Sequence, residues 1–82
     1  STGYIQGSVN VRSSVSAYGN GDTLSTITGS NNSFKVMYAK PGTYSLTIVS
    51  ASALFYDSTL TNISVVSGQV TNVGMINLRA KL

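Results

Sequence analysis

Few residues in this chain of 82 amino acids could carry out acid–base or nucleophilic chemistry. Histidine, cysteine and glutamate are absent, and Asp22 and Asp57 are the only acids. A serine or threonine nucleophile needs a base beside it, and Lys35 or Lys40 could serve only if strongly desolvated. A catalytic carboxylate pair would have to use the two aspartates, which both fall in expected loops. The composition therefore predicts a protein that is not an enzyme.

The Asn20-Gly21-Asp22 segment is the best place to look for a metal site. Calcium takes six to eight oxygen ligands, commonly from several carboxylates. This segment supplies one carboxylate, one amide and backbone carbonyls. Because glycine and asparagine tolerate positive φ, a tight turn is the better interpretation. We expect no metal and no cofactor.

The tyrosines are the best candidates for ligand binding. Tyr4 and Tyr18 occupy the polar positions of alternating segments, while the position of Tyr56 is ambiguous. Tyr38 and Tyr44 fall on positions expected to face a core. Exposed aromatic rings can stack on sugars or anchor a protein contact. The alternative for Tyr4 and Tyr18 is ordinary cross-strand packing on a sheet face.

The charge distribution argues against two classes of partner. The net charge of +3 arises because acids are scarce, and the five basic residues are spread along the chain. Nucleic-acid binding requires lysines and arginines gathered on one face, so no nucleic-acid partner is expected. No apolar run approaches the 18 residues or so that would span a membrane. A neutral, hydroxyl-rich β surface is typical of extracellular modules, so an extracellular or cell-surface location is expected.

Alternating apolar and polar residues, with a period of two, run through most of the chain and predict strands. No segment has the period of a helix. Seven short strands separated by turn signals predict an all-β fold, a seven-stranded antiparallel Greek-key β-sandwich. The expected strands are 4–11, 15–18, 24–28, 34–38, 43–49, 60–66 and 70–78. Residues 50–59 could be a loop with an aromatic plug or an extra strand.

The order of several short motifs resembles that of the carboxypeptidase regulatory-like domains. The motifs are GSV at 7–9, VSAY at 15–18, SFKV at 33–36, PGTYSL at 41–46, VVSGQ at 65–69 and GMINL at 74–78. One departure is Asn32-Ser33, where the family usually has Asp-Gly. The resemblance implies a transthyretin (prealbumin)-like sandwich that serves as an accessory module in a bacterial or archaeal secreted protein. The family has no shared catalytic residues to transfer to this chain.

These observations favour one domain over residues 1–82, excised from a larger secreted protein. We expect a non-catalytic structural spacer or protein-interaction module whose partners are neighbouring domains of the parent chain. The alternative is a carbohydrate-binding module that holds a polysaccharide on Tyr4, Tyr18 and Tyr56. The arrangement of these rings separates the two hypotheses, because sugar binding requires them to share a row or a groove.

Overall fold

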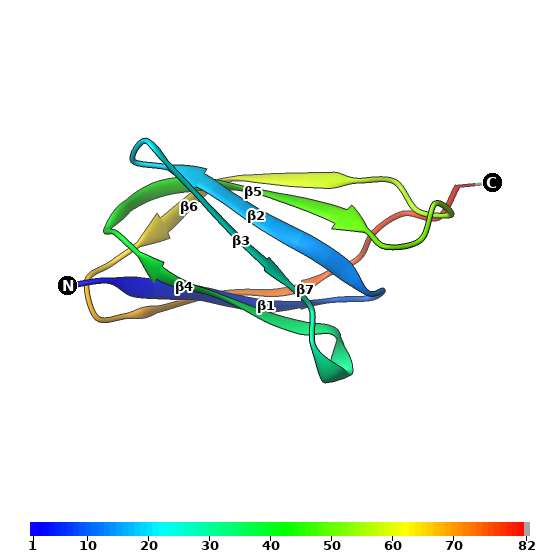
Figure 1. Cartoon of the computed structure of the whole chain (residues 1–82), viewed down its shortest axis with the longest axis horizontal. Helices are drawn as coiled ribbons and strands as arrows, with labels where there is room; N and C mark the ends of the chain where they lie inside the picture. The colour runs from blue at the N-terminus through cyan, green and yellow to red at the C-terminus, as the bar shows by residue number, and fades with distance from the viewer. Residues whose placement is uncertain (82) are drawn as a thin grey trace.

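A computed structural model describes residues 1–81 and contains the seven expected strands. They are β1 (Gly3–Val9), β2 (Ser13–Gly19), β3 (Asp22–Ile27), β4 (Ser33–Ala39), β5 (Gly42–Ser50), β6 (Ser58–Val65) and β7 (Val70–Ile76), with a short 3₁₀ turn η1 (Ser30–Asn32). The strands form two layers, a sheet ordered β4-β1-β7 and a sheet ordered β3-β2-β5-β6 (Figure 1). The β-sandwich is therefore confirmed.

The expectation of a wholly antiparallel sandwich is wrong for one pair of strands. β1 and β7 run parallel, while the other four pairs are antiparallel. β6 belongs to the four-stranded sheet, and the turn after it carries the chain across to the other sheet. The direction of β7 is therefore set by β6 on the opposite layer, and not by a hairpin with β1. Parallel neighbours need such a crossover, which strand periodicity does not reveal.

Alternate residues of both sheets meet in a single core. The fully buried side chains include Ile5, Val15, Tyr44, Leu46 and Ile48. They come from β1, β2 and β5, the strands in the middle of their sheets. This inward set matches the period-two pattern of the sequence, because successive side chains of a strand point to opposite faces.

Tyr38 was expected in the core, and the structure places it outside. Its φ is +62° and its side chain is 76% exposed. The register between β1 and β4 shifts between Gly3 and Ile5, so β4 carries an extra residue at this point. Such a bulge reverses the alternation beyond it. Ala39 consequently takes the buried position.

Between the end of β5 at Ser50 and the start of β6 at Ser58, the chain forms a loop with one short pairing and no extra strand. Phe55 pairs with Ala80 in an isolated antiparallel bridge, and Lys81 donates its backbone N–H to the Leu54 carbonyl at 2.7 Å. The Asn10 side chain exchanges two hydrogen bonds with the backbone of Leu78, at 3.1 and 2.8 Å. These contacts tie the segment after β7 to both layers.

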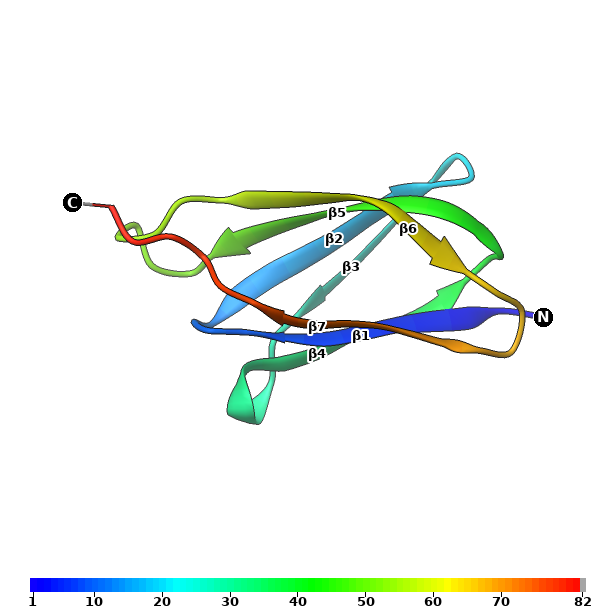
Figure 2. The ribbon, with the colours of Figure 1, turned by 180° about the vertical axis from the view of Figure 1, so that it is seen from behind.

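The two ends of the described part of the chain, residues 1–81, lie at opposite ends of the molecule. Its principal axes measure 42, 23 and 16 Å. The blue start of the ribbon and the red end of its described part lie toward the two extremes of the long axis in both views (Figures 1 and 2). Residues 1–81 contain no helix long and apolar enough to cross a membrane.

Candidate functional site

Tyr4 lies on the outer face of the β4-β1-β7 sheet. It is half-buried, and the Lys35 ammonium sits 5.3 Å from the centre of its ring. On its other side it pairs with Val70 of β7. A cation above an aromatic face is held there by electrostatic attraction, and the Lys35 side chain also covers part of the Tyr4 ring. Tyr4 therefore packs against its neighbours across the sheet.

Tyr18 lies on the outer face of the other sheet. It is 45% exposed and stands in a cross-strand row between Thr23 of β3 and Ser45 of β5. The next row along β2 aligns hydroxyl residues, and Ser16 and Ser25 in that row are hydrogen-bonded at 3.2 Å. This face therefore combines hydroxyl groups with one aromatic ring and with the exposed aliphatic side chains of Ile27 and Val49.

Tyr56 occupies a third location, in the connection between β5 and β6. Its ring is half-exposed, with the Lys81 ammonium 5.4 Å from its centre, and its backbone N–H donates to the Arg79 carbonyl at 2.8 Å. Tyr4, Tyr18 and Tyr56 thus lie on two different sheet faces and one loop. They share neither a row nor a groove, which is the arrangement that disfavours a tyrosine-based sugar site.

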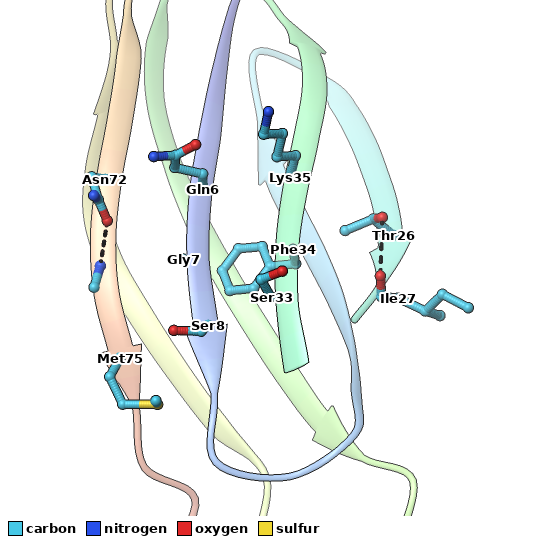
Figure 3. A pocket seen from close by; sticks show the side chains of 11 residues that line it. Gln6, Gly7, Ser8, Thr26, Ile27, Ser33, Phe34, Lys35, Asn72 and Met75 are labelled. Atoms are coloured by element: carbon cyan, nitrogen blue, oxygen red, sulfur yellow. Dashed lines mark hydrogen bonds between the residues drawn. The ribbon is translucent and has the colours of Figure 1, made fainter. Parts of the chain in front are cut away.

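A shallow groove of about 700 Å³ lies over the outer face of the β4-β1-β7 sheet, and Thr26 and Ile27 of β3 also line it. We call it the outer groove, and Figure 3 shows its side chains. Those that carry its chemistry are Gln6, Ser8, Ser33, Lys35, Asn72 and Met75. Gly74 leaves its part of the groove open, because no atom lies within 4 Å of where its Cβ would be.

Strand register aligns the polar groups of the outer groove. Gln6 pairs with Lys35 on one side and with Asn72 on the other, so two amides and one ammonium form a row across three strands (Figure 3). Asn72 Oδ1 accepts a hydrogen bond from the Gly74 N–H at 2.9 Å. This leaves the Asn72 amide nitrogen free to act as a donor. The row can hold polar or anionic groups by hydrogen bonds, but it contains no acid–base pair.

The sequence alone does not predict this groove. Gln6, Ser8 and Lys35 do occupy the polar positions of their strands, which is a signal that they face outward. The sequence does not reveal the order of the strands in the sheet, in which β1 lies between β4 and β7. Those two neighbours are distant in sequence, and one of them runs parallel.

The two aspartates are not brought together. Asp22 begins β3 beside the β2–β3 turn, and Asp57 precedes β6, so they lie toward opposite ends of the molecule (Figure 1). Asp22 forms an exposed ion pair with Lys40 at 3.9 Å. Within residues 1–81 no three residues among His, Cys, Asp and Glu gather where they could hold a metal. The described side chains therefore offer neither a carboxylate pair nor a metal-binding cluster.

Comparison with known proteins shows the fold of this chain. No protein-family model and no curated protein matches the sequence. The structure is similar to one chain of a type II cohesin–X-dockerin complex from Acetivibrio cellulolyticus, solved as a C-terminal interface mutant. The TM-score is 0.71 at 20% sequence identity, over 94% of this chain and 57% of that one. The chain thus has the β-sandwich fold and spans little more than half the length of this neighbour.

Proposed function

We propose that this chain is a non-catalytic spacer and protein-interaction module of a multidomain protein that works outside the cell or on its surface. The observation that carries the proposal is the position of its ends, at the two extremes of the 42 Å axis. A chain that enters at one end of a rigid sandwich and leaves at the other separates its neighbours by the length of the sandwich. Because both ends are surface-exposed, further domains can follow without disturbing the core.

The chemistry of the surface supports the same function. The outer groove offers two amides, three hydroxyls and one ammonium for contact with a polypeptide, and it includes no titratable acid. The similar solved structure is a complex of cohesin and X-dockerin. Within the proposal, the partners are neighbouring domains of the parent chain, and the order of motifs supports membership of the carboxypeptidase regulatory-like domains in a bacterial or archaeal protein.

The experiment is small-angle X-ray scattering on two copies of the chain joined directly end to end. We expect an elongated particle whose maximum dimension approaches twice that of one copy. Two copies joined through a long glycine–serine linker are the matched control, because such a linker behaves as a flexible coil and broadens the distance distribution. A directly joined pair that folds into a compact particle would contradict a spacer role.

A further inference from the structure

The Asn20 side chain holds two turns together at the end of the sandwich where the N-terminus lies. Its amide nitrogen donates to the Pro41 carbonyl at 2.9 Å, and to the Lys40 carbonyl and the Tyr44 hydroxyl at 3.3 Å each. The Tyr44 hydroxyl in turn donates to the Lys40 carbonyl at 2.7 Å. We call this set of contacts the Asn20 clamp. It joins the β2–β3 turn to the turn between β4 and β5.

Asn20 is also the only asparagine of the chain that is followed by glycine. Asparagine is a chemically labile residue, and a following glycine presents no side chain that would hinder attack on its amide. We propose that Asn20 is a site of spontaneous deamidation, that the clamp protects it while the domain is folded, and that the reaction disables the clamp.

The reaction is an internal displacement followed by hydrolysis. The Gly21 backbone nitrogen attacks Asn20 Cγ, the bond from Cγ to Nδ2 breaks, and ammonia leaves with the proton given up by the Gly21 nitrogen. Water then opens the resulting succinimide ring at either of its carbonyls. The product at position 20 is an aspartyl or an isoaspartyl residue, and the only co-reactant is water.

The folded structure opposes the first step. Gly19 pairs with Asp22, so Asn20 and Gly21 are the two central residues of a tight hairpin turn, with φ of +51° and +72°. Hydrogen bonds from Nδ2 to three oxygens outside this turn restrict the rotation of the Asn20 side chain. The turn must open before the Gly21 nitrogen can approach Cγ, so the rate in the native protein follows the fraction of molecules with this end locally open.

The product cannot re-form the hydrogen bonds to the Lys40 and Pro41 carbonyls. A carboxylate at position 20 only accepts hydrogen bonds, whereas the clamp uses Asn20 entirely as a donor. It would bring a negative charge against the Lys40 and Pro41 carbonyl oxygens, which are also acceptors. Asn72 uses its side chain in the opposite way. Its Oδ1 accepts a hydrogen bond from the Gly74 N–H, and an aspartate carboxylate at this position could accept the same bond.

The test measures deamidation of the wild-type chain by mass spectrometry, in buffer and in unfolding concentrations of urea at the same pH and temperature. We expect deamidation at Asn20 in urea and a rate at least about tenfold lower in the folded protein, because reaction requires opening. Equal rates in the two conditions would overturn the protective role. If the proteolytic fragment that contains residues 19–22 stays unmodified in urea, the assignment of Asn20 as a deamidation site is overturned.

Two substitutions test the consequence for the clamp. We expect Asn20→Asp to lower the urea midpoint of unfolding, while the matched control Asn72→Asp leaves it nearly unchanged. An Asn20→Asp variant that does not fold at all counts as the same loss, provided that Asn72→Asp folds normally. A midpoint for Asn20→Asp equal to that of the wild type would show that the clamp contributes nothing to stability and would overturn this part of the proposal.

Discussion

Truncation of Leu46 to alanine tests whether β5 buries this side chain in the core. Leu46 lies in the middle of β5, is fully buried, and pairs with Ala17 of β2 and Leu60 of β6. Deleting a buried leucine side chain costs the transfer energy of its methyl groups and leaves a cavity, together about 2–5 kcal/mol. A domain of 82 residues has a total stability of roughly 4–12 kcal/mol. Leu46→Ala should therefore remove a large part of the free energy of unfolding.

Urea unfolding followed by circular dichroism measures this loss. With a slope of about 1 kcal/mol per molar urea for so small a domain, the midpoint should fall by about 2 M or more. Val49→Ala is the matched control, because Val49 lies on the same strand but faces outward and is 40% exposed. It should cost less than about 1 kcal/mol, the range of strand propensity. A loss below about 0.5 kcal/mol for Leu46→Ala would refute the assigned facing of β5.

Three further predictions follow from other parts of the structure. Gly42→Val should lower stability by about 1–3 kcal/mol in the same urea assay, since a Cβ at Gly42 would overlap the Asn20 side chain, and unchanged stability would contradict that contact. Asn10→Ala should remove the protection of the Leu78 amide in hydrogen exchange at a global cost of about 1 kcal/mol, whereas retained protection would mean that Asn10 does not hold this segment. On a glycan array the wild type and Tyr18→Ala should give the same background signal, and binding lost in the variant would revive the sugar-binding hypothesis.

The positions of the strands could be predicted from the sequence because each buries one face. Residues 43–49 alternate cleanly, and the structure buries Tyr44, Leu46 and Ile48 as expected. Tyr38 shows where this reasoning fails, since a bulge inserts one residue and reverses the alternation beyond it. Nothing in the local pattern of β4 marks that insertion.

The candidate surface was harder to predict because it depends on which strands are neighbours. Tyr4, Tyr18 and Tyr56 are outward or half-exposed residues, yet topology places them on three separate surfaces. The row of Gln6, Lys35 and Asn72 exists only because β1 lies between an antiparallel and a parallel partner. Periodicity reports which face a side chain is on and carries no information about strand order.

The distance between the two ends of the chain tests the proposed spacer role most directly. The sequence contains no cysteine, so the substitutions Ser1→Cys and Lys81→Cys create two defined sites for spin labels. The distance between the labels is measured by pulsed electron–electron double resonance. We expect a single narrow distance close to the 42 Å length of the long axis. A distance close to the 23 or 16 Å of the shorter axes would place both ends on the same side and contradict the proposed function.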